Sequence, residues 1–417
     1  MKQINNSKGF TLVEMIVVMA VFIVVIIITG NSFNTILQQS SRLFRSEESN
    51  IEGIIGLEML RHDIQQAGYG LFWEQSDPPA AYTGEAAAAP ANAYNDGTQG
   101  PPRAVVTDTY ATATNITSDD SSTLSILSGS DYLVIKATSV ARNKIAQKWS
   151  YLNYSSGEVT ANRWLSNAEN FAAGDKVVAL RRTVSSSTNR VILHADENGD
   201  AYVAYSNAAF DHMSSAASSI MTIYGVDDSA TLRMPFNRVD YFVARPPAGS
   251  KPAVCSTNNK VGTLYKATIN QIGGTLNAQP ILDCVADMQI VLGWDLRDSG
   301  CSSGSDGQID TWSNANGTAT MKDPVSSATC AVVDPTEVAN ALADPAIIRN
   351  SLKIVKVYVL AQQGRKDTGY TSVNPVLVGD AGESTLARSY TLDADMLNYR
   401  WKVYRIVTRP KNLLSNQ

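Results

Sequence analysis

The feature that most constrains this chain is an unbroken apolar run near its start. Residues 15–28 read MIVVMAVFIVVIII, and residues 10–13 extend the run to about 20 residues, roughly the length that a helix needs to cross a lipid bilayer. One charge interrupts it, Glu14, and a carboxylate in an apolar span is costly enough to need a partner. Lys2 and Lys8 precede the run, which predicts that the extreme N-terminus stays cytoplasmic.

Three kinds of segment begin in this way. A secretory signal peptide needs a small-residue cleavage site after the apolar run, and the sequence Ile28-Thr29-Gly30-Asn31-Ser32 is a poor one. A plain signal anchor explains the length of the run but neither Glu14 nor the junction at residues 8–10. The third kind is a prepilin signal, which is cleaved before the apolar run.

Residues 8–14 read Lys-Gly-Phe-Thr-Leu-Val-Glu and resemble the class III signal of type IV prepilins. The resemblance implies that a prepilin peptidase cleaves between Gly9 and Phe10, that Phe10 is N-methylated, and that the apolar run stays in the mature protein. It also implies other minor and major pilins as partners. Cleavage would expose an amine on Phe10, and Glu14 of one subunit would pair with that amine on a neighbour. The alternative is that Glu14 reaches the membrane interface and pairs with nothing.

The apolar pattern changes beyond residue 29. From Phe33 to Ile64 apolar residues recur mostly at steps of three and four, which predicts an amphipathic helix that ends at Gln66, before Gly68 and Gly70. Gly30 is a candidate bend in this helix. We therefore expect three parts: a cleaved leader (1–9), a long helix (10–66, with 10–29 in the membrane or filament core) and an extracytoplasmic head (67–417).

The head is predicted to be mainly β-structure. Residues 77–103 and 115–130 are expected to be loops, whereas short β-branched or aromatic runs predict strands; these runs are 132–138, 176–182, 190–194, 201–205, 239–244, 264–269, 281–294, 352–361 and 398–408. Asn198-Gly199 predicts a hairpin turn between two of them. Asp334 followed by Pro335 predicts a helix to about Arg349. One long helix followed by many strands predicts an α+β fold, pilin-like, with a mainly antiparallel head.

Further segments resemble one pilin subgroup, the PilW-type minor pilins. They include residues 62–70, which are similar to the "LRRAGY" helix end with Gln65 and Gln66 in place of two arginines, residues 129–135 (the "GSD" strand) and residues 283–289 (DCVADMQ). The resemblance implies a role in priming or capping type IV pili. A GspJ-like pseudopilin of type II secretion and a pilus-tip adhesin are the alternatives. The implied location is the inner membrane, crossed once with a periplasmic head, and then the pilus at the cell surface.

The cysteines are Cys255, Cys284, Cys301 and Cys330. In an extracytoplasmic head an even number predicts two disulfides with three alternative pairings. We favour Cys255–Cys284 and Cys301–Cys330, because each pair spans 29 residues and closes one loop beside a strand. Free thiols are the alternative, and the spacing does not fit the paired cysteines of a zinc site.

An acidic, glycine-rich stretch lies at residues 295–310. Its end resembles the middle of a calcium loop, so Asp295, Asp298, Asp306 and Asp310 are candidate calcium ligands; an ordinary solvated turn is the alternative. Otherwise we expect no cofactor.

Composition and motifs exclude several function classes. The formal charge of −5 gives no basic field for nucleic acid. The three histidines lie outside any G-x-S-x-G, H-E-x-x-H or P-loop motif, so we expect neither an enzyme nor a small-molecule substrate.

Overall fold

The computed structural model describes residues 11–75, 82–98, 100–141, 143–155, 158–185, 188–194, 199–206, 210, 220–229, 231–323, 330–383 and 385–413. By compactness the chain forms two units, Met1–Ile51 and Glu52–Gln417. This boundary lies inside the long helix, because the last helical turns pack with the head. The predicted division into leader, helix and head at residues 9 and 66 stays a prediction.

Helix α1 runs from Leu12 to Gln66 and ends at the residue that the sequence pattern predicted. In the first unit, Leu12–Phe33 is long and apolar enough to cross a membrane, and none of its apolar window is buried. Past the helix end, Gly68 and Gly70 have φ of 84° and 68°, a backbone region that glycine enters without strain. The amphipathic pattern predicted for residues 34–52 stays a prediction, because the side chains of these residues lie outside the described part.

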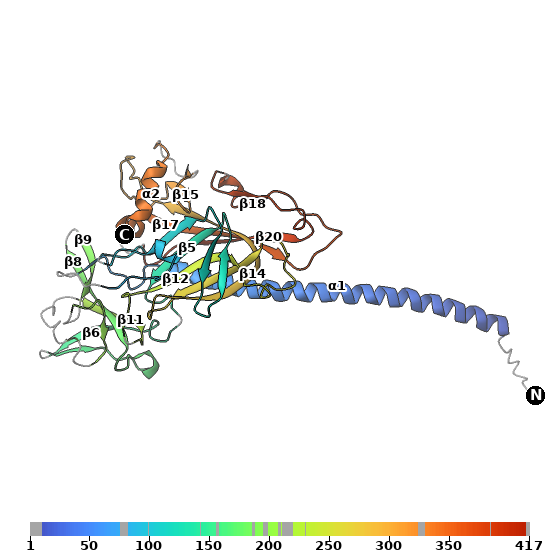
Figure 1. Cartoon of the computed structure of the whole chain (residues 1–417), viewed down its shortest axis with the longest axis horizontal. Helices are drawn as coiled ribbons and strands as arrows, with labels where there is room; N and C mark the ends of the chain where they lie inside the picture. Colours follow the sequence, from blue (N-terminus) through green and yellow to red (C-terminus); the bar gives the residue numbers. More distant parts are fainter. Residues whose placement is uncertain are drawn as a thin grey trace, which may run out of the picture. The chain divides into compact units, whose positions relative to one another are not determined.

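The second unit is built on a large, mainly antiparallel sheet (Figure 1). Its centre is β12 (Asn237–Arg245), β13 (Gly262–Ile269) and the long β14 (Leu276–Trp294), which pair in that order. Beyond β14 follow β17 (Leu352–Gln363) and β20 (Arg400–Thr408). On the other edge of β12 lie β5 and then β2 (Asp131–Ala137 and Val105–Thr109). The α+β prediction is confirmed.

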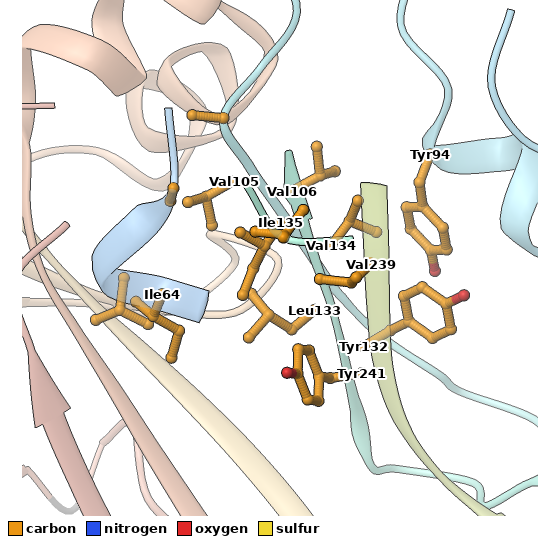
Figure 2. Packing of buried hydrophobic residues seen from close by; sticks show 14 of the residues in the cluster. Ile64, Tyr94, Val105, Val106, Tyr132, Leu133, Val134, Ile135, Val239 and Tyr241 are labelled. Atoms are coloured by element: carbon orange, nitrogen blue, oxygen red, sulfur yellow. The ribbon is translucent and has the colours of Figure 1, made fainter. Parts of the chain in front are cut away.

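One face of this sheet holds the end of α1. Leu57, Leu60 and Ile64 are buried in one apolar cluster with Leu133, Ile135 and Tyr241 of the sheet (Figure 2). The helix approaches β14 closely, since a Cβ added at Gly56 would lie 2.1 Å from the carbonyl oxygen of Ile281. Only a glycine allows this contact.

The opposite face of the sheet is covered by residues 82–98, which include the short helix η1 (Ala91–Tyr94). Tyr94 stacks on Tyr132 of β5 with ring centroids 4.7 Å apart. All seven residues of β5 are therefore buried, as expected for a strand covered on both faces. Residues 82–98 were predicted to be part of a loop, and contact with the sheet is what orders them.

A second sheet contains β8 (Lys176–Ser185), with β11 (Ile220–Asp227) on one edge. The other edge pairs first with β9 (Thr188–His194) and then with β10 (Val203–Ala204). The predicted hairpin between β9 and β10 is therefore wrong: Val203 lies opposite Val177 and His194 opposite Ala179, so the two strands continue each other along β8. Asn198, in the predicted turn, lies outside the described residues.

Several predicted loops contain regular structure. Residues 115–130 include most of a β3–β4 hairpin, and the predicted helix at 335–349 is two helices, α2 and α3. Asp344-Pro345 ends the first of these and caps the second, because proline cannot continue a helix. The other elements are β1 Glu74–Gln75, β3 Thr114–Thr117, β4 Thr123–Ile126, β6 Trp149–Ser155, β7 Glu158–Ala161, η2 Asn167–Glu169, β15 Thr311–Asn314, β16 Thr320–Lys322, α2 Pro335–Ala343, α3 Pro345–Ser351, β18 Val376–Val378, η4 Ala381–Glu383 and β19 Arg388–Tyr390.

Candidate functional site

The N-terminal motif is described from Thr11 onward. Glu14 Oε2 accepts hydrogen bonds from the backbone N–H of Thr11 at 3.0 Å and from its hydroxyl at 2.9 Å. The Thr11 hydroxyl in turn accepts from the Glu14 N–H at 3.3 Å. This reciprocal pair is a capping box, which satisfies backbone donors that a helix N-terminus leaves free.

The capping box is a role for Glu14 that the sequence analysis missed, although Thr11-x-x-Glu14 is its sequence signature. Gly9 and Phe10, the predicted cleavage site, lie outside the described residues. The pairing of Glu14 with a Phe10 amine therefore stays a prediction. In the monomer the carboxylate stabilises its own helix start.

A buried ion pair fixes the other end of the helix. Asp63 Oδ2 accepts hydrogen bonds from Lys266 Nζ of β13 and, at 2.6 Å, from the Tyr241 hydroxyl of β12. The side chains of Asp63 and Lys266 are only 7% and 6% exposed. An ion pair in such a position fixes geometry more than it adds stability, because both charges lose their hydration. Asp63 belongs to the segment 62–70 that resembles the PilW helix end, but its partner could not be inferred from sequence.

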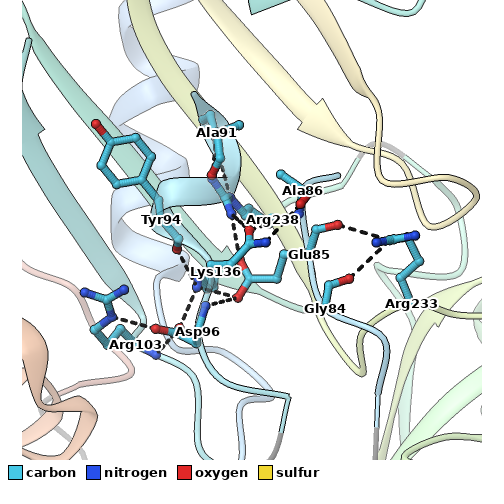
Figure 3. Close-up of polar contacts among 12 residues, drawn as sticks. Gly84, Glu85, Ala86, Ala91, Tyr94, Asp96, Arg103, Lys136, Arg233 and Arg238 are labelled. Atoms are coloured by element: carbon cyan, nitrogen blue, oxygen red, sulfur yellow. Dashed lines mark hydrogen bonds and ion pairs between the residues drawn. The ribbon is translucent and has the colours of Figure 1, made fainter. Parts of the chain in front are cut away.

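A larger buried network joins residues 82–98 to the sheet (Figure 3). Lys136 Nζ contacts Glu85 Oε1 at 2.6 Å and also pairs with Asp96. Arg238 Nη1 contacts the second oxygen of Glu85 at 2.8 Å, and its Nε contacts Asp240 at 2.7 Å. The two cations on the sheet, Lys136 and Arg238, are thus matched by acids of the covering segment and by Asp240 of β12 itself, as buried ions require.

Two further segments that resemble the PilW type meet in the head. The Gly129 carbonyl accepts from Gln289 Nε2 at 2.9 Å, and Asp131 Oδ2 accepts from the Ile290 N–H at 2.7 Å. Burial raises the pKa of Asp131, and it raises the pKa of Asp287 to about 6 against the opposing effect of Arg388. The contacts give these segments a structural role: they hold the start of β5 against β14.

Both disulfides are present in the predicted pairing. Cys255–Cys284 ties the loop before β13 to β14, and Cys301–Cys330 ties the acidic loop to the segment before α2. The Cα atoms are 5.0 and 5.3 Å apart, within the usual range for disulfides.

The four candidate calcium ligands accept hydrogen bonds from the protein. Asp310 Oδ2 accepts from two backbone N–H groups at 2.7 and 2.8 Å, and Asp295 accepts from Ser305 and Gly307 and pairs with Lys353. Asp298 and Asp306 accept from backbone N–H groups of their own turns. Among the described residues no group of three or more His, Cys, Asp or Glu is placed to hold a metal ion. Calcium binding stays a prediction, and these hydrogen bonds account for the carboxylates as turn formers.

Comparison with known proteins gives a match at the N-terminal segment. Residues 4–30 match the family described as the prokaryotic N-terminal methylation motif. No curated protein and no solved structure matches the chain. The match and the apolar N-terminal helix support a type IV pilin-like class III signal, and with it a place among the type IV pilins and pseudopilins. Such a signal implies processing by prepilin peptidase, contact with other pilins and membrane anchoring through this helix.

Proposed function

We propose that this chain is a minor pilin of the PilW type that acts in priming or capping type IV pili. The observation that carries the proposal is the methylation motif at residues 4–30, which overlaps a 22-residue apolar segment, Leu12–Phe33, with none of its apolar window buried in the protein. Apolar side chains in this position need lipid or other helices around them. A pilin provides both in turn, first in the membrane and then in the filament.

Assembly in this proposal uses the two ends of α1 differently. Glu14 leaves its capping box and pairs with the Phe10 amine of a neighbouring subunit, which fixes the stagger between adjacent helices. The Asp63–Lys266 pair keeps the other end of the helix attached to the head. The partners are other minor and major pilins, and the head is periplasmic before it reaches the cell surface. Two disulfides agree with an oxidising compartment.

The proposal includes no catalytic step, nucleic acid or small-molecule substrate. The buried charges of Figure 3 could suggest an active site, but Lys136 and Arg238 are both paired with Glu85, and this pairing holds residues 82–98 on the sheet. We therefore assign these charges a structural role.

Mass spectrometry of the N-terminal peptide from native membranes tests the proposal. We expect a peptide that begins at N-methylated Phe10. A peptide that begins at Met1 would indicate a plain anchor, and one that begins after Gly30 a secreted protein; either result would contradict the proposal.

A second measurement separates a pilus from a secretion pseudopilus. We expect the chain to co-purify with sheared surface pili and its deletion to abolish or reduce them. Loss of secreted enzymes with normal pili would instead favour the GspJ-like pseudopilin.

A further inference from the structure

A cavity of about 470 Å³ lies between one end of the large sheet and the β18–β19 ribbon. Its volume is within the range of small-molecule sites. Three cationic side chains line it, Arg245, Lys260 and Arg388, which come from the end of β12, the loop before β13 and β19. No part of the proposed pilin function uses this cavity.

The cations in the cavity are not equally neutralised. Lys260 pairs with Asp393 at 2.6 Å and Arg388 with Asp287 at 3.1 Å. Among the described residues no carboxylate lies within ion-pair distance of Arg245, whose Nη2 donates to the Ser125 hydroxyl at 2.8 Å and whose Nε is buried without a hydrogen-bond partner. The charge of Arg245 also lowers the pKa of Lys251, after the larger effect of burial. Arg245 thus brings a positive charge without a carboxylate partner in the described part of the chain to the wall of the cavity, and such a charge favours an anion.

The remaining walls favour a ligand larger than an inorganic ion. Ser128, Asn259, Ser389 and Thr391 offer hydroxyl and amide groups, and Leu127 and the buried Tyr390 add apolar surface. Polar groups together with an apolar wall suit a ring that carries several hydroxyls.

We propose that this cavity binds an acidic sugar, with the sugar carboxylate on Arg245 and the ring hydroxyls on the surrounding serine, threonine and asparagine side chains. The proposal goes beyond assembly and does not depend on it. A surface-exposed pilin with such a site would attach to polysaccharides that contain uronic acids.

Calorimetric titration of the full-length protein in detergent tests the proposal. The probe is glucuronic acid, with glucose as the neutral sugar of the same ring and acetate as the carboxylate alone. We expect saturable binding of glucuronic acid and at least about tenfold weaker binding of both controls. Glucose lacks the carboxylate and its charge-assisted hydrogen bond to Arg245, and acetate lacks the ring hydroxyls and their hydrogen bonds. No binding of glucuronic acid, or equal binding of glucose, would overturn the proposal.

Variants of the cavity residues test whether glucuronic acid binds in this cavity. Arg245→Gln should weaken glucuronic acid binding at least about tenfold. Lys260→Gln, at a side chain that is 55% exposed and therefore tolerant of change, should weaken it by a smaller factor. Arg163→Gln, at an exposed arginine that does not line the cavity, is the matched control and should bind normally. Unchanged binding in both cavity variants would place the ligand elsewhere and reject the assignment, whatever the outcome of the processing experiment.

Discussion

Both ends of helix α1 carry large apolar side chains, but these side chains have different surroundings at the two ends. In Leu12–Phe33 every side chain is exposed, for example Ile16 at 60%, whereas Leu60 and Ile64 are fully buried against the sheet. The first end contains one carboxylate in its own capping box, and the second contains a carboxylate that is bound by the head. Apolar composition alone therefore does not tell where a helix finds its partners. The first end depends on lipid or other subunits, and the second on its own chain.

Removal of the buried carboxylate should produce the largest effect. Asp63→Ala leaves Lys266 buried without its counter-charge, which should lower the free energy of unfolding by about 3–5 kcal/mol. Glu58→Ala is the matched control on the same helix, because its pair with Arg61 is exposed and should be worth at most about 1 kcal/mol. Thermal or denaturant unfolding measures both, and equal effects would contradict the anchoring role of Asp63.

Both disulfides lie in the second unit, where we expect them to stabilise the head. Each should contribute about 2–4 kcal/mol, so reduction should lower the melting temperature of the head by several degrees. Replacing Cys255 and Cys284 by serine, and separately Cys301 and Cys330, would divide the effect between the two loops. A melting temperature insensitive to reductant would show that the thiols are free in the native protein.

The buried Asp287 predicts a pH dependence within the head. Its pKa is raised from 3.8 to about 6, so the folded state holds this proton more tightly than the unfolded state. The resulting stabilisation is complete below pH 4 and is lost as the pH rises toward 6, on the order of 3 kcal/mol in total. Asp287→Asn keeps an acceptor for Arg388 but does not titrate. Its stability relative to wild type should rise between pH 4 and 6.5, and parallel curves would disprove the assignment.

Substitution of two glycines in α1, Gly56 and Gly30, compares how tightly the two ends of the helix are packed. A Cβ at Gly56 would overlap the Ile281 carbonyl, while a Cβ at Gly30 has no atom within 4 Å. Gly56→Ala should destabilise the protein by about 1–3 kcal/mol, and Gly30→Ala should leave the melting temperature of the head unchanged. If both substitutions were neutral, the close helix–sheet contact would not exist in solution.

Glu14 should have the smallest effect on stability and a large one on assembly. Glu14→Ala should leave cleavage and the melting temperature of the head intact but impair incorporation into pili. Glu14→Gln keeps an acceptor for the Thr11 N–H and removes only the charge. If the charge pairs with the Phe10 amine, both variants fail to assemble; normal assembly of Glu14→Gln would assign Glu14 to the capping box alone.

Much of this molecule follows from local sequence. The membrane-length run, the helix end at Gln66 and the Asp334-Pro335 helix start are set by hydropathy, glycine and capping chemistry within a few residues. The disulfide pairing also agreed with the expectation from spacing. These features do not require knowledge of distant partners.

Tertiary structure decided the rest, because the partners are far apart in the chain. Residues 82–98 have no periodic pattern, and they are ordered by ion pairs between Glu85 and the sheet residues Lys136 and Arg238. The predicted β9–β10 hairpin is wrong because both strands pair with β8, one after the other along the same edge, and not with each other. Asp63 and Lys266 are 203 residues apart. Hydropathy and turn chemistry act over a few residues, whereas burial of a charge is decided by whichever side chains the fold brings to it.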